Sequence, residues 1–205
     1  MAVPPPFPPA PAMADMAAEP SKPAQRAELR ARRDAFVLDL EPGERALLEA
    51  RAAARLMPLV EGAGCVAFYQ AIGSEMGCGP AIDLAAAAGM AIALPHVAGH
   101  DRPMRFLRWR PGDPLERGWR GLIQPLAASA EIRPDMVVTP LLGFDSARRR
   151  LGQGAGFYDR AFATIGGGVK KIGWGWSVQQ LDPIACDPWD VPLDAVVTET
   201  TLIGG

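Results

Sequence analysis

The chain has 205 residues, 49% of them hydrophobic, and carries a formal net charge of −2. A chain of this length and composition fits a single domain with a proper hydrophobic core. The charge argues against a basic surface for nucleic acid, and no run of 18 apolar residues marks a membrane span. The three cysteines form no CxxC pair, so we expect free thiols and a reducing, cytoplasmic location. We also expect a monomer or a weak homo-oligomer.

The first twenty residues, MAVPPPFPPAPAMADMAAEP, are rich in proline and alanine. Proline removes a backbone donor and the segment has little to bury, so we expect residues 1–20 to form a disordered tail. The segment lacks the basic start and the continuous apolar middle of a secretory signal. Met13 and Met16 are possible alternative starts. Residues 21–205 are then expected to form one α/β domain.

Two helices are expected at the start of this domain. Apolar side chains recur at helical spacing in residues 24–40, AQRAELRARRDAFVLDL, and again in residues 42–60, PGERALLEARAAARLMPLV. Pro42 occupies a position where the second helix can begin, and Gly62 and Gly64 would end it.

Strands and helices are expected to alternate from residue 65 onward. The runs CVAFYQAI and AIALPHV read as buried strands, and PAIDLAAAAG between them reads as a helix. Such a strand–helix–strand unit is almost always right-handed, with its two strands parallel. The expected strands span residues 65–72, 91–97, 104–109, 136–144, 170–176 and 194–199, and the expected helices span residues 80–89 and 158–165. This order predicts an α/β fold, with a three-layer, mainly parallel sheet and helices on both faces.

Two tryptophans, Trp174 and Trp176, fall in the strand expected at residues 170–176. Side chains two positions apart in a strand point to the same face. We therefore expect both indoles on one side of the sheet, packed in the core or cleft or stacked on a bound ring.

The stretch RRRLGQGAGFYDR, residues 148–160, links an expected strand to the helix after it. In open α/β sheets, ligands bind at the carboxyl ends of the strands. The three alternating glycines would let backbone amides approach an anion, the helix N-terminus adds more amides, and Arg150 can grip phosphate with a planar fork. The spacing matches neither GxGxxG nor a Walker loop. The stretch is therefore either a phosphate loop or a flexible surface loop with solvated arginines.

Two aspartates are candidate magnesium ligands. Asp159 falls in the first turn of the helix after the loop, where the helix dipole alone favours a carboxylate. Beside bound phosphates, however, a carboxylate would repel its ligand unless a cation such as Mg²⁺ bridged the two. Asp190 comes shortly before the last expected strand and could be a second ligand or an ordinary turn residue.

The run TPLLGFDSARRRLGQGAGFYDRAF resembles the signature of the 5-formyltetrahydrofolate cyclo-ligase family. The family's pattern is close to P-x-x-[AG]-FD-x-x-G-x-RLG-x-G-x-G-[YF]-YD-R. Four weaker segments follow the family's order: AELRARRDAF, GSEMGCGPAIDL, MRFLRWRPGDPL and WDVPLDAVVTE. The resemblance covers residues 24–202, and its RLGQGAGFYD core is the specific part.

The resemblance implies an enzyme that converts 5-formyltetrahydrofolate to 5,10-methenyltetrahydrofolate with ATP and Mg²⁺, releasing ADP and phosphate. It implies that the formyl oxygen takes a phosphoryl group from ATP, that N10 closes the ring, and that phosphate leaves. Phosphoryl transfer needs positioning and charge neutralisation more than a protein nucleophile, which suits a chain with two histidines. The implied architecture is NagB/RpiA/CoA-transferase-like, and the implied partners are small molecules, without nucleic acid or membrane.

The resemblance also implies roles for individual residues. Arg150 and Tyr158 would be catalytic, and Asp159 and Asp190 would hold Mg²⁺. The implied ATP-binding residues are Arg26, Arg30, Arg150, Leu151, Gly152, Gln153, Gly154, Ala155, Gly156, Phe157 and Tyr158. The implied folate-binding residues are Glu75, Gln153, Gly154, Ala155, Gly156 and Phe157.

The chain departs from the family's pattern at four positions. Arg26 replaces a lysine, Phe157 replaces a tyrosine, Cys78 stands where threonine is common, and FDSARRR lacks the usual glycine. At Arg26 the positive charge is retained, although a planar guanidinium does not substitute freely for an ammonium group. None of the four departures removes a predicted phosphate or metal ligand. They therefore bear on substrate preference more than on the nucleotide site.

Two other functions stay open from the residues. One is a phosphosugar isomerase or CoA-transferase relative, which would act without ATP. The other is a folate- or nucleotide-binding module without catalysis, which would bind ligand without releasing phosphate.

Overall fold

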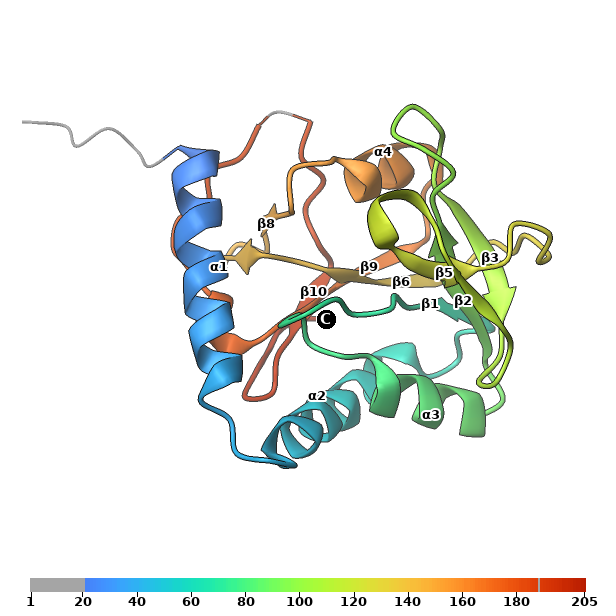
Figure 1. Ribbon diagram of the computed structural model, residues 1–205, viewed down its shortest axis with the longest axis horizontal. Coiled ribbons are helices and arrows are strands. Elements are labelled where there is room, and N and C mark those ends of the chain that lie inside the picture. The colour runs from blue at the N-terminus through green and yellow to red at the C-terminus, as the bar shows by residue number, and fades with distance from the viewer. Residues whose placement is uncertain (1–20, 188) are drawn as a thin grey trace, which may run out of the picture.

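A computed structural model describes residues 21–187 and 189–205 of the chain (Figure 1). The tail expected at residues 1–20 lies outside the described residues. The helices are α1 (Lys22–Leu38), α2 (Glu44–Val60), α3 (Gly79–Ala87) and α4 (Phe157–Thr164), with short 3-10 turns η1 (Trp119–Gly121) and η2 (Ser177–Gln179). Within the described residues, no helix is long and apolar enough to cross a membrane.

The main sheet has seven strands in the order β11-β10-β9-β6-β1-β2-β3. Its central five strands are parallel, and the two edge strands run antiparallel to their neighbours. The strands are β1 (Cys65–Ala67), β2 (Ala91–His96), β3 (Arg105–Trp109), β6 (Met136–Pro140), β9 (Lys170–Trp174), β10 (Ala195–Val197) and β11 (Leu202–Gly204). Two small hairpins join β4 (Leu115–Arg117) to β5 (Ile123–Pro125) and β7 (Gly143–Phe144) to β8 (Arg150–Leu151).

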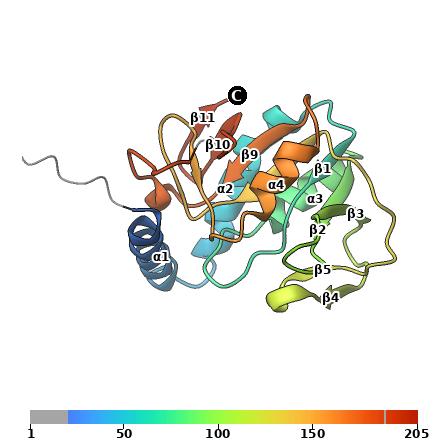
Figure 2. The same cartoon turned by 90° about the horizontal axis from the view of Figure 1, so that it is seen from above.

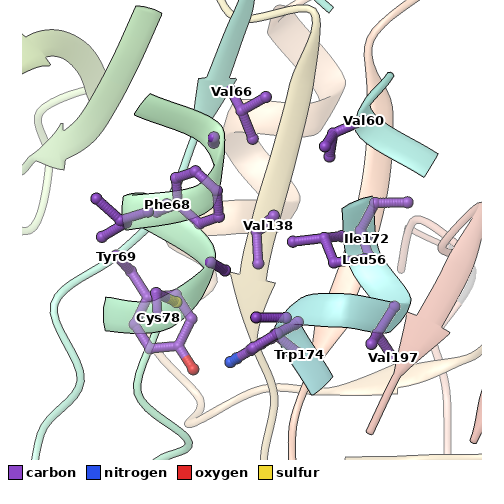
Figure 3. Close-up of a cluster of buried hydrophobic side chains, with 14 of the residues drawn as sticks. Leu56, Val60, Val66, Phe68, Tyr69, Cys78, Val138, Ile172, Trp174 and Val197 are labelled. Carbon is purple, nitrogen blue, oxygen red and sulfur yellow. The ribbon is translucent and has the colours of Figure 1, made fainter. Parts of the chain in front are cut away.

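Helices cover both faces of the sheet (Figures 1 and 2). On one face, Leu56 of α2 packs in a buried cluster with Val66, Val138 and Ile172 from three neighbouring strands (Figure 3). The alternate residues of those strands point to the other face, where Phe162 of α4 packs. The α/β prediction of a mainly parallel sheet between helices is therefore confirmed.

Helix α1 packs across the carboxyl end of the sheet, beside β8 (Figure 1). Its Leu29 is fully buried in a separate cluster with Leu142, Leu151 and Ile184. The contact fixes the first helix against the stretch that is a candidate phosphate loop.

All six expected strands are shorter in the structure, and the first and fourth differ most. The first ends at Ala67 rather than at residue 72, because the following apolar residues cover the core after leaving the sheet. The strand expected at 136–144 ends at Pro140, which has no N–H to continue a ladder, and the chain then forms the β7–β8 hairpin. The sequence reading missed both hairpins and β11.

The expectation that Trp174 and Trp176 lie in one strand is wrong. The strand β9 ends at Trp174, and Trp176 precedes the turn η2. Both indoles are nevertheless buried in the core cluster, at 1% and 0% exposure. Core packing, one of the two expected roles, is what the structure shows.

A side chain at Gly143 is expected to destabilise the fold. A Cβ there would overlap Cδ1 of Leu29 and lie 3.1 Å from Cδ1 of Ile184, in a cluster with no free surface. Overpacking of this kind costs about 1–3 kcal/mol, so Gly143→Ala should lower the free energy of unfolding in urea by that amount. The control Gly79→Ala meets nothing within 4 Å and should leave stability unchanged or slightly raised. Equal stability of the two variants would contradict the close packing of α1.

The three thiols are expected to differ sharply in reactivity. Burial raises the pKa of Cys65 to about 11, with a further contribution from Asp135, and burial also raises the pKa of Cys78. Cys186 is exposed. Iodoacetamide at a pH of about 8 should therefore modify Cys186 alone in the folded chain, because the thiolate is the reactive form. Peptide mass spectrometry would show this, with labelling in urea as the control; equal labelling of Cys65 in the folded chain would contradict it.

Candidate functional site

A cleft of ≈ 870 Å³ opens at the carboxyl ends of the central parallel strands. Pro95 of β2 and Pro140 of β6 form part of its floor, and the loops that follow β1, β2 and β8 form its walls. The cleft collects residues from both ends of the chain, from Lys22 to Asp190. The sequence-predicted site residues that line it are Arg26, Glu75, Arg150, Leu151, Gly152, Gln153, Gly154, Ala155, Gly156, Phe157, Tyr158, Asp159 and Asp190.

Arg30 is the predicted site residue that does not line the cleft. It lies one helical turn beyond Arg26 on α1 and is exposed. Its Nη2 donates to Oε1 of Gln153 at 2.8 Å. Arg30 therefore contacts the predicted phosphate loop from outside rather than facing the cleft.

The loop after β8 has the backbone shape that its glycines allow. Gly154 and Gly156 have φ values of +102° and +66°, which L side chains rarely adopt. Gly156 is the N-cap of α4, so the loop leads directly into the helix N-terminus and its free amides. Nε of Arg26 donates to the carbonyl of Gly152 at 3.0 Å, which ties the loop to α1.

Arg150 and Asp159 form an ion pair within the cleft. Nη2 of Arg150 donates to Oδ1 of Asp159 at 2.7 Å, and the side chains are 5% and 25% exposed. The guanidinium also lies 5.7 Å from the ring centroid of Tyr158, and its Nε is buried without an acceptor in the described part of the chain. Arg150 is predicted to bind phosphate and Asp159 to bind the metal. In this structure their charges neutralise each other.

Asp190 is paired with a lysine that the sequence reading missed. Lys22, at the start of α1, donates to Asp190 and also to Oδ2 of Asp187, at 2.6 Å from the latter. Burial acts to lower the pKa of Lys22, but the hydrogen bonds to the two carboxylates outweigh it and the net pKa is raised. Lys22 therefore stays charged and holds the segment around Asp190 against α1.

The acidic groups of the cleft fit a metal that arrives with a phosphate ligand. Among residues 21–187 and 189–205, no group of three His, Cys, Asp or Glu side chains is close enough to hold a metal by itself. Asp159 and Asp190 nonetheless line one cleft, and Mg²⁺ commonly takes one or two carboxylates and fills its remaining positions with phosphate oxygens and water. The donor set suits a nucleotide-bound Mg²⁺ better than a resident ion.

Tyr158 presents a neutral phenol to the cleft. Burial raises its pKa above the ordinary value for a tyrosine. Its ring packs at 5.9 Å from Phe162 in a tilted arrangement. At neutral pH this side chain can donate a hydrogen bond to a ligand, but it cannot act as a base.

Glu75 faces the loop after β8 from the opposite wall of the cleft. Its Oε2 accepts from the backbone N–H of Ile72 at 3.0 Å, and its Oε1 lies 3.4 Å from Nε2 of Gln153. The second contact is long, so the carboxylate keeps acceptor capacity for a ligand. The structure thus brings the residue predicted for folate beside the loop predicted for phosphate.

An aromatic rim at the cleft was not predicted. The rings of Trp119 and Phe157 meet edge to face at 5.2 Å, with the imidazole of His100 6.1 Å from the indole. Arg160 lies 4.9 Å from the centroid of Phe157 and donates to the carbonyl of Ala155 at 3.0 Å. These residues come from the loop after β2, the turn η1 and α4 with the segment that leads into it, so no local sequence pattern connects them.

Comparisons with known proteins agree on one family. The model of the 5-formyltetrahydrofolate cyclo-ligase family matches residues 18–199. The chain is 30% identical over 170 residues to a 5-formyltetrahydrofolate cyclo-ligase of Escherichia coli, an alignment that covers 78% of this chain and 92% of that protein. It is 32% identical over 141 residues to the protein of the same name from Mycolicibacterium smegmatis, covering 65% of this chain and 72% of that one.

Solved structures show the same fold. The NMR structure of 5,10-methenyltetrahydrofolate synthetase from Aquifex aeolicus superposes with a TM-score of 0.71 at 27% identity, covering 86% of this chain and 91% of that one. A 5,10-methenyltetrahydrofolate synthetase from Mycoplasma pneumoniae superposes with a TM-score of 0.68 at 22% identity, covering 87% and 98% of the two chains.

Proposed function

The chain belongs to the 5-formyltetrahydrofolate cyclo-ligase family, and we propose that its cleft converts 5-formyltetrahydrofolate to 5,10-methenyltetrahydrofolate with ATP and Mg²⁺. One observation carries the proposal. The glycine loop with its helix N-terminus, the Arg150–Asp159 pair and Glu75 all line one cleft at the carboxyl end of a mainly parallel sheet. The mixed sheet between helices also supports a NagB/RpiA/CoA-transferase-like architecture in a single domain.

The nucleotide side of the cleft is the loop of residues 150–158 together with Arg26. Its glycines and the first amides of α4 offer neutral N–H donors to phosphate oxygens, and Arg26 and Arg150 supply positive charge. The neutral phenol of Tyr158 adds a further donor. Bound Mg²⁺ would neutralise the charge that spreads over the phosphate oxygens during transfer.

The Arg150–Asp159 pair would change partners when the nucleotide binds. In this structure Nη2 of Arg150 donates a hydrogen bond to Oδ1 of Asp159 at 2.7 Å, so each charge has a partner. An ATP–Mg²⁺ complex brings an anion and a cation together, so Arg150 can turn to phosphate oxygens while Asp159 turns to the metal without leaving either charge unpaired. Asp190 would be the second carboxylate, released in the same way from Lys22.

The folate side of the cleft is the wall that carries Glu75. A carboxylate can accept two N–H donors arranged side by side, as a pterin ring presents them. Gln153 links Glu75 to the phosphate loop, so the formyl group of a bound folate would lie close to the transferred phosphate. Placing the two reactants in one geometry supplies much of the acceleration in a reaction of this kind.

The test is a single set of assays on the purified chain. With 5-formyltetrahydrofolate, ATP and Mg²⁺, the absorbance of the methenyl product should appear, and omission of ATP should abolish it. Turnover of a sugar phosphate without ATP would favour the isomerase alternative instead. Thermal shifts with folate or ATP, without release of phosphate at high enzyme concentration, would indicate a binding module and contradict the proposal.

A further inference from the structure

The loop that carries Glu75 is held by side chains at every backbone carbonyl from residue 73 to residue 77. Arg45 of α2 donates from Nη1 to Gly73 at 3.2 Å and from Nη2 to Glu75 at 2.6 Å. Aromatic donors bind the other three carbonyls: Trp176 Nε1 to Ser74 at 2.9 Å, Tyr69 Oη to Met76 at 2.7 Å, and Trp174 Nε1 to Gly77 at 3.2 Å. Loop carbonyls are more usually left to water or to the backbone.

The three aromatic donors belong to the core. Trp174, Trp176 and Tyr69 are 1%, 0% and 4% exposed, and all three lie in the cluster beneath α2 and α3. Their polar atoms need partners when buried, and the loop provides them. This part of the loop is therefore fixed by the same packing that fixes the sheet.

Arg45 holds the loop from its outer side. Its side chain is 36% exposed, and its Nε donates to Oε1 of Glu49, one turn further along α2, at 2.9 Å. The same Oε1 accepts from the backbone N–H of Gly77 at 2.8 Å, and a Cβ on Gly77 would lie 2.9 Å from it. Arg45 and Glu49 together thus bind both ends of the segment that presents Glu75.

We infer that Arg45, which lies outside the cleft, is a positioning residue that fixes the carboxylate of Glu75 for binding the folate. The inference rests on the proposed function. Arg45 binds the carbonyls on both sides of Ser74, including that of Glu75 itself, so its loss would release the backbone from which the carboxylate extends. The planar guanidinium of Arg45 binds the carbonyls of Gly73 and Glu75 at fixed angles, and the ammonium group of a lysine cannot reproduce this geometry.

The experiment compares substitutions along one helix. Arg45→Met should raise KM for 5-formyltetrahydrofolate about tenfold, as expected for the loss of charged hydrogen bonds, while KM for ATP and kcat change by less than about threefold. Arg45→Lys should give an intermediate KM. Arg51→Met, an exposed position on the same helix, is the matched control and should match the wild type. An unchanged folate KM in Arg45→Met would overturn the inference.

A double-mutant cycle with Glu75→Gln separates positioning from general damage to the fold. If Arg45 acts through Glu75, Arg45→Met should add little to the folate KM once Glu75 is glutamine. A further tenfold rise in the Glu75→Gln background would overturn the inference. Calorimetric titration of folate into each variant accompanies the kinetics. If the wild type binds folate without turning it over, the proposed reaction is overturned. The folate dissociation constants of the wild type and of Arg45→Met would then still test the role of Arg45.

Discussion

Asp159→Asn is expected to lower kcat roughly 10³-fold, the scale seen when a charged group of a transition state loses its partner. Asparagine keeps the size of the side chain and one oxygen but loses the charge. Arg150 would then lack its counter-ion in the free enzyme. The nucleotide-bound Mg²⁺ would lose the carboxylate that we propose for it. The measurement is kcat over a Mg²⁺ titration, in which the variant should also need a higher Mg²⁺ concentration for half-maximal rate.

The control for this variant is Asp83→Asn, at an exposed aspartate of α3 that does not line the cleft. It should keep full turnover and an unchanged Mg²⁺ requirement. Far-UV circular dichroism of Asp159→Asn should match that of the wild type, since its carboxylate is a quarter exposed rather than deeply buried. Full activity in a folded Asp159→Asn variant would remove this aspartate from the metal role.

Arg150→Lys is expected to lower kcat about 10²-fold, although the charge is retained. The guanidinium reaches Asp159 and also the carbonyl of Pro140 at the end of β6, at 3.5 Å, and its side chain is 5% exposed. An ammonium on a flexible stem cannot keep these contacts and bind phosphate with two parallel donors. Steady-state kinetics with varied ATP would show the loss.

The neighbouring residue supplies the matched control. Arg149 bears the same side chain but pairs with the fully buried Asp145, and it does not line the cleft. Arg149→Lys should therefore leave kcat within about twofold of the wild type, because residue 149 lies away from the cleft and lysine retains the positive charge beside Asp145. Equal losses of kcat in both variants would contradict a special role for Arg150 in the cleft.

The conformation of the glycine loop could be predicted from sequence because it depends on neighbouring residues. Alternating glycines, a preceding strand and a following helix specify the turn into α4 within a dozen residues, and the structure starts that helix at Phe157, one residue before the predicted position. The helix α2 and the strand β2 could also be predicted, from the helical spacing of apolar residues in the first and from a short apolar run in the second. The roles proposed for the loop residues remain predictions.

The short strands could not be predicted in the same way. The strands β4, β5, β7 and β8 have two or three residues each, so they exist through their pairing partners rather than through any periodicity of their own. The end of β1 could not be predicted either. The apolar run continues past Ala67, and its residues are buried in the core although the chain has left the sheet.

The sequence by itself determined the family, the α/β class and the set of residues around one glycine loop, since these follow from local patterns and from motif order. Tertiary structure alone decided their pairing: Arg150 with Asp159, Lys22 with Asp190, and Arg45 with the loop of Glu75. The last two pairs join residues 168 and 30 positions apart. Such contacts form where packed elements meet, and the spacing of residues along the chain does not predict them.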